Sequence, residues 1–220
     1  MKFIKRQQSG FTLVEIAIVL VIIGLLLGGV LKGQEMIENS RIKSVVADMR
    51  GVSSAYNSYF DRFHAVPGDE LLLTMTNRGW AAVATTGNGN GVLTVTPAQT
   101  FLNGGEEQSF WQVLRYAGFT SGDPTAIGAT ALPKTGTGGL IGVTQAPYGM
   151  VGPAVCVSGL STKQARGIDS VIDNSEINNT GDARGINGAA NPLAPAAVAP
   201  ALTQYNEAVI LNTWTMCRPL

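Results

Sequence analysis

Residues 11–31 read FTLVEIAIVLVIIGLLLGGVL, and the only charged side chain among them is that of Glu15. At a rise of 1.5 Å per residue this stretch forms about 31 Å of helix, which matches a bilayer hydrocarbon core of about 30 Å. The leader in front of it, MKFIKRQQSG at residues 1–10, has basic residues and no acidic one. The positive-inside rule therefore places the leader in the cytoplasm and everything after residue 31 on the other side of the membrane.

The junction at Gly10 differs from an ordinary secretory signal, whose small-residue cleavage site follows the apolar stretch instead of preceding it. Cleavage after Gly10 would keep the apolar helix in the mature protein. The run GFTLVE, with a basic leader before it and an apolar helix after it, resembles the class III signal of type IV pilins and type II secretion pseudopilins. This resemblance implies cleavage between Gly10 and Phe11 by prepilin peptidase, N-methylation of Phe11, and assembly with other pilin or pseudopilin subunits at an inner-membrane platform.

Glu15 needs a partner if it lies in lipid, because a carboxylate at the centre of a membrane helix costs on the order of 2.5–3.5 kcal/mol on insertion scales. The resemblance implies that Glu15 of one subunit pairs with the amine of Phe11 in its neighbour, and that this pair draws each new subunit into the filament. The alternative is a carboxylate close enough to the interface to be hydrated or protonated.

The composition argues against nucleic acid and against catalysis. Basic and acidic residues number 15 each, and no block of like charge follows the leader. The chain thus lacks the electrostatic footprint of a nucleic-acid binder. Its one histidine, His64, and its two cysteines do not have the spacing of a zinc site. We identify no catalytic residue and expect no enzyme.

The two cysteines, Cys156 and Cys217, both follow the membrane segment, where an oxidising compartment would allow them to pair. A disulfide closing this interval would stabilise the folded part of the chain after the membrane segment by roughly 2–4 kcal/mol, and it would hold the C-terminal strand in place. Two free buried thiols are the alternative.

The helical pattern continues beyond the membrane segment. Apolar residues recur at spacings of three and four up to the proline and glycine at residues 67–68, which predicts a single helix over residues 11–63. The residues on this apolar face are Ile42, Val45, Val46, Met49, Val52, Tyr56, Tyr59, Phe60 and Phe63. The chain then divides into a cleaved leader (1–10), a membrane or filament-core helix (11–31), its amphipathic continuation (32–64) and a periplasmic head (65–220).

The head has the signals of short helices and strands. Acidic residues in the first turn and a glycine stop predict a helix over residues 106–117, and Ser161 or Thr162 can cap another over residues 163–172. Strands are expected at residues 140–143, 150–151, 154–158 and 208–215. Residues 63–69 and 161–174 resemble segments of pseudopilin-like minor pilins. This resemblance implies an α+β fold in which the long helix packs on an antiparallel sheet.

A candidate calcium site lies in the C-terminal part of the head, where six oxygen-bearing residues fall close together: Asp169, Asp173, Asn174, Glu176, Asn178 and Asp182. Calcium prefers such hard oxygen ligands, although the spacing is not that of an EF-hand. Some pseudopilins bind calcium in a comparable loop. The alternative is a solvated loop held by Asx turns.

Three kinds of function remain compatible with the sequence. The first is a filament subunit, which explains the leader, Gly10, Glu15 and the continuous helix together. The second is an adhesin or ligand-binding minor pilin whose loops at residues 65–103 and 118–139 recognise a ligand. The third is an enzyme held by an uncleaved anchor, which makes Gly10 and Glu15 accidental. We favour the first, in which the subunit passes from the inner membrane into a filament.

Overall fold

The structure is a computed structural model that describes residues 12–80, 83, 87–173, 179–201, 205–206 and 213–220. It divides into two compact units, Met1–Ser40 and Arg41–Leu220, here called the N-terminal and C-terminal units. A single helix, α1 (Leu13–Phe63), continues from the first unit into the second. This helix confirms the prediction of one helix that ends at the proline and glycine after Phe63.

The N-terminal unit is the first part of α1, and its apolar side chains are exposed on every face. The helix is long and apolar enough to cross a membrane. No other described residue packs against this apolar surface, so packing within the described chain does not account for its apolar side chains. Past the apolar segment, Lys32 and Glu35 form an exposed ion pair at 2.8 Å.

In the C-terminal unit α1 buries one face. The buried residues recur at spacings of three and four: Ile42, Val45, Val46, Met49, Val52, Ala55 and Tyr59. The prediction of Phe60 as a core residue was wrong, since its side chain is 46% exposed. One residue further along a helix is a rotation of about 100°, which turns Phe60 away from the face that carries Tyr59.

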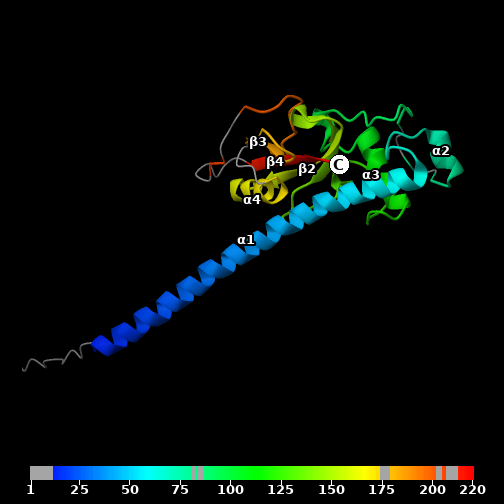
Figure 1. The fold of residues 1–220 in the computed structure, drawn as a ribbon. Coiled ribbons are helices and arrows are strands. Elements are labelled where there is room, and N and C mark those ends of the chain that lie inside the picture. The colour runs from blue at the N-terminus through cyan, green and yellow to red at the C-terminus, as the bar shows by residue number, and fades with distance from the viewer. Residues whose placement is uncertain (1–11, 81–82, 84–86, 174–178, 202–204, 207–212) are drawn as a thin grey trace, which may run out of the picture. The chain divides into compact units, whose positions relative to one another are not determined.

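The described residues form one antiparallel sheet with the strand order β1-β2-β4-β3. Its strands are β1 (Ile141–Gln145), β2 (Pro153–Leu160), β3 (Arg184–Gly188) and β4 (Thr213–Pro219). Figure 1 labels β2, β4 and β3, which lie close together in the C-terminal unit. Most of the central pair is buried, with six of eight residues buried in β2 and four of seven in β4. The sheet and α1 share one hydrophobic core, which gives the expected α+β fold.

Cys156 in β2 lies directly opposite Cys217 in β4, and the two form a disulfide with a Cα–Cα distance of 4.0 Å. The predicted pairing is therefore confirmed. The bond closes a sequence separation of 61 residues, for which the loop-closure model gives roughly 4 kcal/mol. It fastens the last strand to the middle of the sheet.

The described residues also form three shorter helices: α2 (Leu72–Asn77), α3 (Glu106–Tyr116) and α4 (Thr162–Ile172). The predictions of α3 and α4 are confirmed. Helix α4 begins at a capping box in which the Ser161 hydroxyl accepts the Gln164 amide N–H and the Gln164 side chain accepts that of Ser161. Gly167 lets α4 lie close to α1, because a Cβ there would collide with Ile42.

Other predicted boundaries need correction. Residues 150–151 form no strand. They directly follow a short 3-10 turn, η3 (Pro147–Gly149), and positive φ angles at Ala146 before it and at Tyr148 within it interrupt the extended backbone. The last strand starts at Thr213, and residues 208–212 of its predicted span lie outside the described part of the chain. Strand β3 and helix α2 were not predicted.

Candidate functional site

The first turn of α1 is closed by a reciprocal pair of side chains. Glu15 Oε2 accepts hydrogen bonds from the Thr12 amide at 2.9 Å and from the Thr12 hydroxyl at 2.8 Å. In return, the Glu15 amide donates to Thr12 Oγ1 at 3.3 Å. This is a capping box, which satisfies backbone N–H groups that a helix start otherwise leaves unpaired.

The capping box fixes the direction in which the Glu15 carboxylate points. Both hydrogen bonds go to Oε2, and within the described residues no hydrogen bond is made by Oε1. The carboxylate also lies in the first turn of the helix, where the helix dipole favours negative charge. Gly10 and Phe11, the other two predicted site residues, lie outside the described part of the chain.

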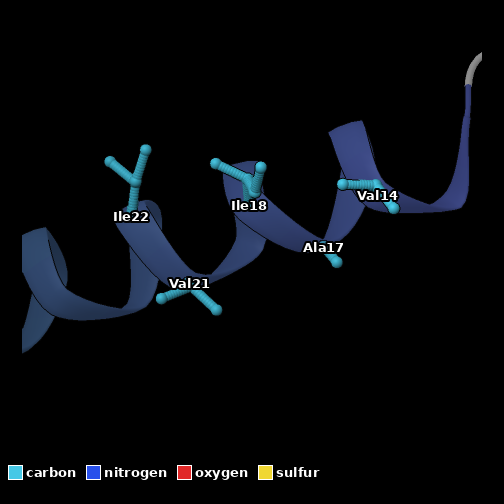
Figure 2. Close-up of a pocket in the computed structure, with 5 residues that line it drawn as sticks. All are labelled: Val14, Ala17, Ile18, Val21 and Ile22. Carbon is cyan, nitrogen blue, oxygen red and sulfur yellow. The ribbon is translucent and has the colours of Figure 1, made fainter.

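A shallow apolar hollow of about 300 Å³ lies on the N-terminal part of α1. Two rows of side chains at four-residue spacing line it, one formed by Val14, Ile18 and Ile22 and the other by Ala17 and Val21. Figure 2 shows Ile18 and Ile22 projecting from one side of the ribbon and Ala17 and Val21 from the other. A ridge of a second helix fits a groove between such rows.

Glycines continue this surface toward the end of the apolar segment. Gly24, Gly28, Gly29 and Gly33 have no atom of the described chain within 4 Å of the place where a Cβ would stand. Each costs about 1 kcal/mol of helix propensity relative to alanine. Small residues at four-residue spacing allow helix backbones to approach closely in membranes. Packing within the described chain does not explain these glycines.

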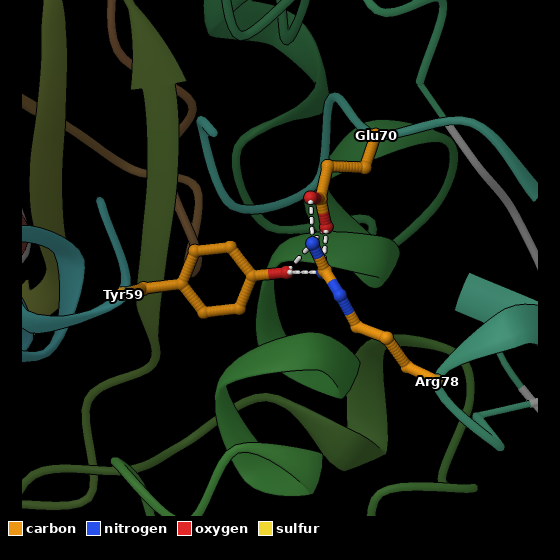
Figure 3. Close-up of polar contacts among 3 residues, drawn as sticks. All are labelled: Tyr59, Glu70 and Arg78. Carbon is orange, nitrogen blue, oxygen red and sulfur yellow. Dashed lines mark hydrogen bonds and ion pairs between the residues drawn. The ribbon is translucent and has the colours of Figure 1, made fainter. Parts of the chain in front are cut away.

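A buried polar cluster lies where α1 ends, and the sequence reasoning missed it. The Arg78 guanidinium binds the Glu70 carboxylate through two hydrogen bonds, at 2.5 and 2.7 Å. Glu70 also accepts the hydroxyl proton of Tyr59 at 2.6 Å. Figure 3 shows the phenol of Tyr59 meeting both charged groups. The cluster fastens the chain after α1 to the last turns of that helix, so we regard it as structural.

Asp69 holds the loop at residues 87–91 in place through hydrogen bonds. Its buried carboxylate accepts amide N–H groups from Gly89 at 3.0 Å, Asn90 at 3.3 Å and Gly91 at 2.6 Å. Residues 88–91 of this loop are exposed. Gly87 is required here, because a Cβ would collide with the Asp69 backbone.

Glu107 is a fully buried carboxyl group at the start of α3. It accepts the amide N–H of Asn103 at 2.9 Å and that of Val143 at 3.4 Å, which joins α3 to β1. Burial raises the pKa of Glu107 to about 9, although the two amide hydrogen bonds lower it. The carboxyl group is therefore protonated in the folded protein at neutral pH.

The raised pKa makes stability depend on pH. Between the ordinary value of 4.5 and about 9, the folded state holds a proton at Glu107 that the unfolded state has released. We expect the free energy of unfolding to fall by about 1.4 kcal/mol per pH unit, or about 2 kcal/mol between about pH 7 and pH 8.5. Denaturant titration of the full chain in detergent measures this slope. Glu107→Gln should flatten it, whereas the exposed-site variant Asp61→Asn should not; an unchanged slope in Glu107→Gln would contradict the assignment.

The predicted calcium ligands are only partly described. Asp169 is buried in α4 and accepts the Tyr205 hydroxyl proton at 2.8 Å, and Asp173 accepts the amide N–H of Ala183 at 2.9 Å. Asp182 is exposed, while Asn174, Glu176 and Asn178 lie outside the described residues. Burial, helped by Asp173, raises the pKa of Asp169 to about 7.

No three His, Cys, Asp or Glu side chains are placed to hold a metal ion in the part of the chain that the structure describes. The calcium site stays a prediction. His64 is exposed in the left-handed conformation just after α1, where its amide closes the helix on the Phe60 carbonyl at 2.8 Å. This position is that of a helix-terminating residue.

Comparison with known families identifies the N-terminal segment. Residues 5–31 match the family model described as the prokaryotic N-terminal methylation motif. This motif is characteristic of type IV pilins and pseudopilins, and in this chain its residues from Leu13 onward lie in the long helix α1, which an α+β arrangement follows. A search of the curated proteins found no match to the chain.

Proposed function

We propose that the chain is a structural subunit of a type IV pilus or of a type II secretion pseudopilus. The observation that carries this proposal is the methylation motif at residues 5–31, whose apolar residues lie in the part of α1 that the rest of the described chain leaves uncovered. An anchor alone needs only length and hydrophobicity. A filament subunit also needs a helix surface that other subunits cover, and the hollow and the glycines of α1 suit that purpose.

The proposed processing begins at the leader. Prepilin peptidase cleaves between Gly10 and Phe11 and methylates the new amine of Phe11. Residues 1–10 are then lost. Residues 11–31 form a helix that first spans the membrane and later lies in the filament core. Residues 32–64 continue this helix, and residues 65–220 form the head. Before assembly the N-terminus faces the cytoplasm and the head faces the periplasm, in agreement with the basic leader.

The proposed assembly step uses the geometry of the capping box. Thr12 holds Oε2 of Glu15, so Oε1 is left to accept a hydrogen bond from the Phe11 ammonium group of a neighbouring subunit. The pair neutralises both charges before the helix enters an apolar filament core, where an unpaired charge is costly. Apolar side chains such as Ile18 and Val21 then pack between subunits at the inner-membrane platform.

We expect Gly10→Val to block processing. The wild-type protein, purified from the membranes of its native host, should lose residues 1–10 and gain one methyl group, as measured by intact mass spectrometry. A side chain at residue 10 prevents the small-residue fit that cleavage requires, so Gly10→Val should keep its leader. Gly24→Val is the matched control, because it changes a glycine of the same segment away from the junction. An intact leader in the wild-type protein would contradict the proposal and indicate a fixed anchor.

A further inference from the structure

The loop that Asp69 holds contains the same dipeptide twice, Asn88-Gly89 and Asn90-Gly91, and all four residues are exposed. An asparagine loses its side-chain amide most readily when glycine follows it, because glycine has no side chain to obstruct attack by its own backbone nitrogen. The φ angles of the two glycines are 72° and 80°, in the left-handed region that favours glycine. The fold of the loop therefore requires glycine after each asparagine.

The geometry of the loop favours this reaction at both asparagines. The side-chain oxygen of Asn88 accepts the amide N–H of Asn90 at 3.0 Å, and that of Asn90 accepts the amide N–H of Val92 at 2.9 Å. An N–H group in this place stabilises the negative charge that develops on the oxygen when a nucleophile attacks the adjoining carbon. Water reaches both side chains, because they are exposed.

The nucleophile, however, is held by Asp69. It is the backbone nitrogen of the following glycine, which attacks after it has lost its proton. The Gly89 amide donates to Asp69 Oδ1 at 3.0 Å, and the Gly91 amide donates to Oδ2 at 2.6 Å. The carboxylate occupies the direction from which the asparagine carbon must approach, since the new bond takes the place of the N–H bond. Its negative charge also opposes loss of the amide proton.

We propose that Asn88 and Asn90 form a latent deamidation site that Asp69 keeps inactive. When a glycine amide leaves Asp69 and gives its proton to hydroxide, its nitrogen attacks Cγ of the preceding asparagine. A nitrogen–carbon bond forms, the bond from Cγ to Nδ2 breaks, and ammonia leaves with a proton taken from water. Water then opens the cyclic imide to aspartate or isoaspartate. The product places a new carboxylate in the loop around Asp69, and repulsion between the like charges loosens the loop. This modification does not depend on filament assembly.

The test compares the full chain in detergent with the free peptide acetyl-GNGNGV-amide, which has the sequence of residues 87–92. Both are incubated in ¹⁸O-labelled water at the same pH and temperature, so that only newly formed product carries the label, and mass spectrometry locates that product. A hydrogen bond to a carboxylate lowers the population of free amide, so we expect deamidation at Asn88 and Asn90 to be at least about tenfold slower in the folded protein. Equal rates in the protein and the peptide would overturn the proposal.

Asp69→Ala frees both glycine amides and should raise the rates at Asn88 and Asn90 at least about tenfold. The matched control lies in the same molecule, at Asn187 followed by Gly188 in β3, where the rate should stay unchanged. An equal rise at Asn187 would indicate general loosening of the fold and would contradict a specific role of Asp69. A slower reaction in Asp69→Ala would show that the carboxylate acts as a base, which also overturns the proposal. Thermal melting shows whether the variant is folded; if it is not, the comparison of wild-type protein with peptide decides.

Discussion

Glu15→Gln should remove the protein from filaments while leaving it in the membrane. Glutamine can still accept the Thr12 hydrogen bonds, so the capping box and the helix start should survive. The negative charge that would pair with the Phe11 amine is lost, which at a desolvated interface costs roughly 2–5 kcal/mol. We therefore expect the amount of subunit in sheared filaments to fall more than about tenfold in the native host.

The matched variant for this prediction is Thr12→Val, which removes the hydroxyl of the capping box but keeps the Glu15 charge. Loss of a cap costs about 1 kcal/mol, so Thr12→Val should reduce incorporation less than Glu15→Gln does. Immunoblots compare the sheared fraction with the membrane fraction for each protein. If Glu15→Gln assembles as well as the wild type, or if Thr12→Val is the more severe of the two, the charge of Glu15 is not what draws the subunit in.

The sequence predicted the elements whose signals are local. Helix α1 has an apolar repeat over dozens of residues, and α4 has a capping residue and an apolar face, so periodicity and capping rules suffice for both. The capping box of α1 was also readable, because Thr12 and Glu15 have the T-x-x-E spacing. Glu15 was interpreted as a partner for another subunit or as a hydrated or protonated carboxylate near the interface, and its contact inside its own chain was missed.

The sequence could not predict features that depend on distant segments. Strand β3 has the sequence RGING, in which the glycines lower strand propensity, and it forms because β4 provides a complete ladder of partners from Thr213 to Cys217. The cluster of Tyr59, Glu70 and Arg78 similarly needs separate segments of the chain to come together. Neither has a repeat or a motif that marks it along the chain.

Arg78→Met should destabilise the C-terminal unit by about 3 kcal/mol. Glu70 is 8% exposed, and in this variant its carboxylate loses both hydrogen bonds from the guanidinium. A buried charge then remains, and among the described residues only the Tyr59 hydroxyl donates a hydrogen bond to it. The guanidinium also lies 4.4 Å from the centre of the Phe63 ring. Methionine keeps the apolar part of that contact, so the loss reports mainly the charge pair. A drop in melting temperature of about 6–12 °C follows for a domain of this size.

Arg62→Met is the matched control, because Arg62 lies over the same Phe63 ring at 5.2 Å but is exposed. Its removal should change stability by less than about 0.5 kcal/mol. The double variant Glu70→Gln with Arg78→Met removes both charges and should therefore recover part of the loss, since no buried carboxylate remains to be solvated. Thermal melting of the full chain in detergent distinguishes these results. If the double variant loses as much as the two single changes added together, the groups contribute independently, and the cluster at the end of α1 does not act as a buried ion pair.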